Sequence, residues 1–182
     1  MQTEPQTKPN SSHRITAIGA LASSWGIIGF FSLVGFAMVR LSAHTLEAFA
    51  QPFTLLQWVV LIVSLVFMAY SEGYKGFQKS FAPRFAARVH YLSSHANGLQ
   101  LVLAPLFCMG FFNAPRRRII TSTLLSSMII LFVLLFKFIP QPWRGIFDAA
   151  VVLGLIWGLT ATAIFCYQAF MTSKPVADPE IN

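Results

Sequence analysis

The stretch AAVVLGLIWGLTATAIFCYQAFM, residues 149–171, decides the fold class of this protein. It carries no charge, and a helix of this length, rising about 1.5 Å per residue, crosses the hydrocarbon core of a bilayer. Its small residues recur at every fourth position and so form one ridge along a helix: Ala150, Gly154, Gly158, Thr162 and Cys166. Small side chains let a second helix approach closely, which stabilises helices inside a membrane. We therefore expect a transmembrane helix whose ridge packs against another helix, in this chain or in a partner.

Three more apolar runs precede this stretch, and together they indicate a multi-pass membrane protein. The chain is 55% hydrophobic and only 10% charged, whereas a soluble domain carries about 25% charged residues. We expect an all-α, polytopic membrane domain over 15–171, with a disordered cytoplasmic tail before it (1–14) and a polar tail after it (172–182). The four predicted transmembrane segments are 15–39, 53–70, 119–138 and 149–171.

The segment LQLVLAPLFCMGFF, residues 99–112, is apolar but short for a transmembrane segment, and it contains Pro105. Its length is typical of a re-entrant or interfacial stretch, with a fifth span as the alternative. If it does not cross, residues 71–118 lie on the same side as both termini, and that side holds ten of the 13 lysines and arginines. If residues 99–112 cross, the termini lie on opposite sides, and the side that holds the N-terminus has only eight of the 13 lysines and arginines. The ten are Lys8, Arg14, Lys75, Lys79, Arg84, Arg88, Arg116, Arg117, Arg118 and Lys174.

The positive-inside rule favours the larger number. The sequence therefore predicts four spans with both termini in the cytoplasm, in an integral protein of a bacterial cytoplasmic membrane. A basic triplet precedes the span 119–138, and we interpret it as a topology anchor: Arg116, Arg117 and Arg118.

The basic loop 71–98 contains a predicted amphipathic helix that begins at Pro83, since proline is tolerated in the first turn of a helix. Basic and aromatic residues fall on one face of this helix, beside an apolar stripe. The pattern is typical of a helix that lies in the headgroup plane of a membrane. We predict a site for an anionic lipid headgroup or another anion, formed by Arg84, Arg88, Tyr91, His95 and Asn97. Anionic lipids then account for the net charge of +7, and no nucleic-acid partner is expected.

The predicted spans contain no Asp, Glu, Lys, Arg or His between their ends. Pumps and ion-coupled transporters need such residues at membrane depth, which argues against these functions. No histidine lies inside a span, as a bridging haem would require, and no Cys/His spacing fits zinc. We therefore expect no metal, no cofactor and no catalytic residue. Cys108 and Cys166 lie in apolar runs, where cysteine acts as a small packing residue.

The stretch HANGLQLVLAPLF, residues 95–107, resembles the loop-to-helix segment of the membrane-associated eicosanoid and glutathione metabolism (MAPEG) family, which consists of small four-helix membrane enzymes. Members of that family carry an arginine shortly before the histidine and a glutamate after the asparagine. In this sequence Ser93 and Ser94 stand where the arginine would be, and Gln100 replaces the glutamate. The charges that would hold glutathione are therefore missing, and the resemblance implies an enzyme only as an alternative function.

These patterns predict a non-enzymatic membrane protein, namely an accessory, assembly or scaffolding subunit that packs through its last helix against another membrane protein or a second copy. The alternative is a small membrane enzyme or lipid-binding protein with a site at the cytoplasmic headgroup interface. A channel or transporter is the third interpretation. An enzyme should bring the polar residues of 84–97 together around a closed cavity. A scaffold should have a filled core and an exposed small-residue ridge.

Overall fold

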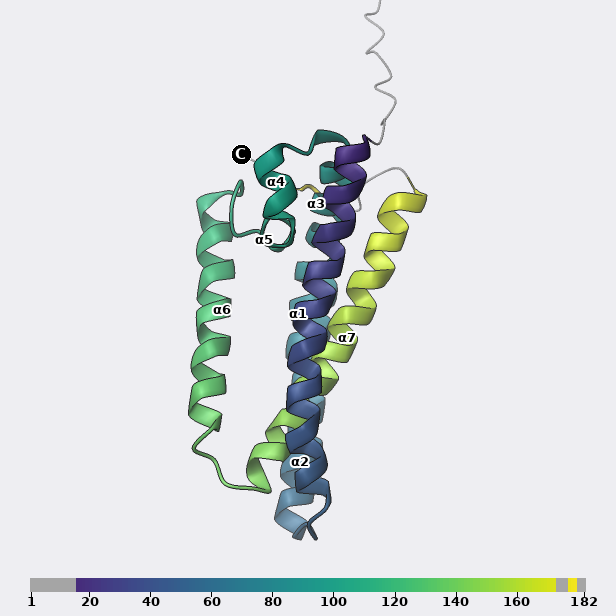
Figure 1. Ribbon diagram of the computed structural model, residues 1–182. Coiled ribbons are helices and arrows are strands. Elements are labelled where there is room, and N and C mark those ends of the chain that lie inside the picture. Colours follow the sequence, from purple (N-terminus) through teal and green to yellow (C-terminus); the bar gives the residue numbers. More distant parts are fainter. Residues whose placement is uncertain (1–15, 173–176, 180–182) are drawn as a thin grey trace, which may run out of the picture.

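The computed structural model describes residues 16–172 and 177–179, and in these ranges the chain is helical with no strand (Figure 1). The predicted tail 1–14 lies outside the described residues. The elements are α1 (Ala17–Phe49), α2 (Leu55–Met68), the π-helix η1 (Ala69–Phe81), α3 (Ala82–His95), α4 (Gly98–Val102), α5 (Ala104–Met109), α6 (Arg116–Phe136) and α7 (Trp143–Met171).

Three helices in the described part of the chain are long and apolar enough to cross a membrane. They are 17–49, the continuous helix 55–95, and 143–171. The helix α6 coincides with most of the predicted span 119–138, and several of its side chains lie outside the described part of the structure. Figure 1 shows it set apart from the other helices, and the Ser122 hydroxyl joins it to α5 by donating to the Met109 carbonyl at 3.3 Å.

The second helix is longer than the sequence predicts, because α2, η1 and α3 follow one another without a break. The predicted span 53–70 continues as helix to His95, so the helix predicted from Pro83 is found, and the prediction that a loop separates it from the span is wrong. Pro83 lies in the first turn of α3, directly after the π-helix. In an α-helix a proline ring clashes with the carbonyl four residues earlier. The i→i+5 turns that precede Pro83 move that carbonyl away from its α-helical position, and the helix continues.

The helix α3 packs between α1, α5 and α7. The sequence predicts an apolar stripe that faces the membrane. Its residues are at most 1% exposed: Phe85, Val89 and Leu92. They form the core together with Phe30 of α1 and Phe107 of α5. The prediction of a helix that lies in the headgroup plane is therefore wrong, because neighbouring helices cover the stripe that would enter the membrane.

Small residues of α1 allow its close approach to α3. The Ser23 hydroxyl donates to the carbonyl of Val89 at 2.9 Å, so the two helices share a hydrogen bond in the core. A Cβ added at Gly19 would collide with the backbone carbonyl of Ser93. The backbones of α1 and α3 are thus in close contact at this end of the bundle, and a larger side chain at Gly19 would force the two helices apart.

Residues 99–112 form two short helices instead of one long one. A capping box of Asn97 and Gln100 starts α4, in which the Asn97 backbone N–H donates to Gln100 Oε1 at 3.1 Å. Pro105 begins the turn of α5 and packs against α1 at Gly29. Gly110 ends α5 in the left-handed conformation, with φ 85°. Figure 1 shows α4 and α5 at the end of the bundle where both α1 and α6 begin.

The ridge of α7 faces the inside of the chain. All five of its residues are buried: Ala150, Gly154, Gly158, Thr162 and Cys166. Gly158 lies against the ring of Phe77, and Gly154 lies against Glu72, so the ridge packs on η1. A partner protein cannot use a ridge that the chain itself covers, and any association through α7 requires another face.

Candidate functional site

Arg88, which the sequence assigns to an anion-binding face, is buried and satisfied by backbone carbonyls. Its side chain is 2% exposed. Nη1 donates to the carbonyls of Phe107 at 2.8 Å and Phe112 at 3.2 Å, and Nη2 donates to Asn113 at 3.0 Å. The guanidinium also lies 5.0 Å from the centroid of the Phe107 ring. Arg88 therefore caps the C-terminal end of α5, where cations are favoured, and the prediction that it binds a headgroup is wrong.

The other four predicted residues do not converge on one site. Arg84 lies at the start of α3 and donates to Ser80 Oγ at 3.3 Å. Tyr91 stacks on the exposed His95, with ring centroids 4.6 Å apart. Asn97, beyond the end of α3, caps α4. The stripe is thus divided by the buried Arg88, and its residues make separate local contacts.

The predicted topology anchor lies at the start of α6. Arg116 and Arg117 are exposed there, at the end of the bundle that also holds α4 and α5 (Figure 1). The side chain of Arg118 lies outside the described part of the structure.

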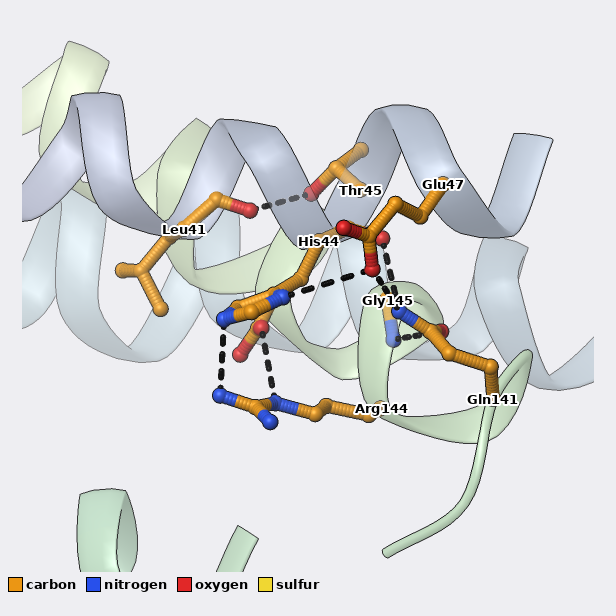
Figure 2. Close-up of polar contacts among 8 residues, drawn as sticks. Leu41, His44, Thr45, Glu47, Gln141, Arg144 and Gly145 are labelled. Atoms are coloured by element: carbon orange, nitrogen blue, oxygen red, sulfur yellow. Dashed lines mark hydrogen bonds and ion pairs between the residues drawn. The ribbon is translucent and has the colours of Figure 1, made fainter. Parts of the chain in front are cut away.

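A polar network joins α1 to the start of α7, and Figure 2 shows Arg144 reaching from α7 to the ring of His44. Arg144 Nη2 lies 2.8 Å from His44 Nε2, and Arg144 Nε lies 3.8 Å from Asp148 Oδ2. Gln141 Nε2 donates to the His44 carbonyl and to Glu47 Oε2, both at 3.2 Å. Asp148 is only 2% exposed and forms an ion pair with Arg144, but neither Asp148 Oδ2 nor Arg144 Nε has a hydrogen-bond partner among the described residues. These groups contact one another, and we interpret them as a link between the two helices.

The outer face of η1 carries two tyrosine–lysine pairs. Lys75 Nζ lies 5.0 Å from the centroid of the Tyr70 ring, and Lys79 Nζ lies 4.8 Å from that of Tyr74. The two rings stack, with centroids 6.0 Å apart, and both lysines are exposed. We call these four residues the Tyr–Lys ladder. Each pair is spaced i, i+5, the spacing that a π-helix brings into register and that a search at α-helical spacing does not detect.

The ladder lies halfway along α7. Trp157, the central residue of α7, donates from Nε1 to Gln78 Oε1 at 2.9 Å and packs against Gly73. One turn further, Gly158 contacts Phe77. The π-helix is therefore level with the middle of an apolar helix, and its outer face presents cations at that level.

The helix that contains the predicted span 53–70 carries ionisable residues directly beyond that span. The predicted span 53–70 ends at Tyr70, but the helix continues through Glu72, Lys75 and Lys79 beside the apolar stretch of α7. Glu72 lies against Gly154 on the α7 side, whereas the lysines are exposed.

A groove of about 480 Å³ adjoins the ladder at Lys79. It runs between η1, the start of α3 and α7, and is lined in part by Tyr74, Gln78, Lys79, Ser80, Arg84 and Phe165. The groove extends the polar surface of η1 toward the end of the bundle where α6 begins.

No group of His, Cys, Asp or Glu within residues 16–172 and 177–179 could hold a metal ion. Cys108 and Cys166 are both buried free cysteines. Burial raises the pKa of the Cys108 thiol and keeps it protonated, which matches a packing role.

In comparisons with known proteins, the chain matches no family model, no curated protein and no solved structure. The short resemblance to the MAPEG family at residues 95–107 therefore has no support from a family match, and the structure gives Asn97 and Gln100 a role in starting α4. Over the residues that the structure describes, the fold is all-helical, with three helices long and apolar enough to cross a membrane.

Proposed function

We propose that this chain is a non-enzymatic accessory or assembly subunit of a bacterial cytoplasmic membrane, and that it associates with another membrane protein through the Tyr–Lys ladder. The chain crosses the bilayer through α1, the helix 55–95, α6 and α7, with both termini in the cytoplasm. The observation that carries the proposal is that two exposed lysines lie halfway along α7, each over a tyrosine ring, of which Tyr70 is exposed and Tyr74 half-buried.

The energetic argument rests on the cost of a cation among lipid chains. A lysine at the centre of a transmembrane helix costs about 2.5–3.5 kcal/mol on insertion scales. A cation–π contact contributes about 0.5–1 kcal/mol at an exposed site and about 2 kcal/mol when desolvated. The tyrosines offset only part of the cost, so the ladder in lipid alone is unfavourable. A polar surface of another protein removes this deficit, as ionisable residues in membrane helices usually face a partner or a bundle interior.

Photo-crosslinking in native membranes tests the proposal. A benzoylphenylalanine at position 70 or 74 preserves an aromatic ring, and we expect it to form a covalent product of discrete mass with one protein. The matched control is Phe36 of α1, which is 64% exposed and should yield only lipid adducts. If positions 70 and 74 also yield only lipid adducts, the ladder faces lipid and the proposed function is wrong.

Cysteine labelling tests the four-span topology. A membrane-impermeant maleimide should label a cysteine at Gln51 in intact cells, and one at Asn113 or Thr172 only after the membrane is permeabilised. All three positions are exposed, and the native Cys108 and Cys166 are buried, so the background is low. Labelling of Asn113→Cys in intact cells would show that 99–112 crosses the membrane.

A further inference from the structure

The geometry of the ladder limits the chemistry of its partner. Lys75 and Lys79 lie four residues apart, each held over a tyrosine ring, and the centroids of the two rings are 6.0 Å apart. On an α-helix, side chains four residues apart have Cβ atoms about 5–6 Å from one another. Two hydrogen-bond acceptors that lie one turn apart on a facing helix therefore have about the same separation as the two tyrosine–lysine pairs.

We infer that the Tyr–Lys ladder binds a transmembrane helix of another protein through two carboxylates spaced i, i+4. The inference rests on the proposed function and names the chemistry of the partner. An ammonium group has only donors, and its strong partners are ionised acceptors. Each carboxylate accepts from one lysine, and the two tyrosine hydroxyls supply further donors beside them.

Two other occupants fit the ladder less well. A phospholipid headgroup lies at the membrane surface, whereas Trp157 and Gln78 place the π-helix level with the middle of α7. A second copy of this chain would need a carboxylate at the same depth. The chain has six Asp and Glu residues in all, and the one in η1, Glu72, lies against Gly154 of its own α7.

The experiment uses the full-length protein in phosphatidylcholine vesicles and measures energy transfer to a labelled synthetic polyleucine transmembrane peptide. One peptide carries two central glutamates spaced i, i+4, and the matched peptides carry two glutamines or two lysines. We expect the glutamate peptide to associate about tenfold more tightly than the glutamine peptide, and the lysine peptide not at all. The Lys75→Gln/Lys79→Gln protein should lose this preference, whereas Glu72→Gln, a charge change at the same level on the α7 side, should keep it.

Equal association of the glutamate and glutamine peptides with the wild-type protein would overturn the inference. A preference that disappears when phosphatidylglycerol replaces phosphatidylcholine would also overturn it, because the ladder would then be a headgroup site. The proposed function fails separately, through the crosslinking at positions 70 and 74. A discrete protein product there, combined with no preference for the glutamate peptide, would mean that a partner exists and that its chemistry is not acidic.

Discussion

Replacing Arg88 by methionine is expected to destabilise the folded protein by about 3 kcal/mol or more, because the three carbonyls that it satisfies are left without their donor. Methionine keeps the apolar part of the side chain and so isolates the loss of the guanidinium. Lysine at this position keeps the charge but lacks the planar fork that serves several acceptors at once, so Arg88→Lys should be intermediate. Thermal unfolding in mild detergent measures the three proteins.

A local consequence separates this effect from general unfolding. Arg88 holds the end of α5, and Cys108 in α5 is 2% exposed. In Arg88→Met, alkylation of Cys108 should become faster well below the unfolding temperature, whereas Cys166 in α7 should keep its wild-type rate. Arg117→Met is the matched control, since Arg117 is exposed and its replacement should change the stability by less than about 0.5 kcal/mol. If Arg88→Met unfolds like the wild type and Cys108 stays protected, the cap does not hold α5.

Glycine-to-alanine substitutions should differ sharply according to what faces each glycine. A methyl group at Gly19 would meet the backbone carbonyl of Ser93, and one at Gly158 would meet the ring of Phe77. Each substitution should cost about 1–3 kcal/mol, as overpacking does in other cores. At Gly35 no atom lies within 4 Å, so alanine should be neutral or should stabilise the helix by up to about 1 kcal/mol.

Gly154 provides the matched control for Gly158, because both residues lie on the ridge of α7. An added Cβ at Gly154 has its nearest neighbour, a Glu72 atom, at 3.5 Å, which is ordinary contact. Gly154→Ala should therefore unfold near the wild-type temperature while Gly158→Ala unfolds lower. Similar melting temperatures for the alanine variants at positions 19, 35, 154 and 158 would contradict the close packing of α1 on α3 and of α7 on η1.

The sequence by itself determines that the chain is helical and that long apolar helices build it. The runs 15–39 and 149–171 coincide with much of α1 and α7, because the need to satisfy backbone groups among lipid chains makes a long apolar run a helix. The break at Pro105 and the length of 99–112 also predict a segment too short to span, and two short helices are found there. These features depend on residues that are neighbours in the sequence.

The small-residue ridge of α7 shows what a local sequence pattern can predict and what it cannot. The spacing of Ala150, Gly154 and Gly158 predicts that another helix approaches α7, and all three are buried. Which helix approaches is not encoded in that spacing. The contacts of Gly158 with Phe77 and of Gly154 with Glu72 arise from η1, a segment in which the sequence indicates a loop.

Only the tertiary structure decided the roles of Arg88 and of the Tyr–Lys ladder. Helical periodicity places Arg88 on a basic face, but the face is covered because the end of α5 brings three carbonyls to it. The ladder residues are polar in any reading of the sequence, and they become significant because Trp157 and Gln78 place them halfway along an apolar helix. Periodicity describes one helix about its own axis. The height of one helix relative to another, and the carbonyl that a given guanidinium meets, are set by packing between residues far apart in the chain.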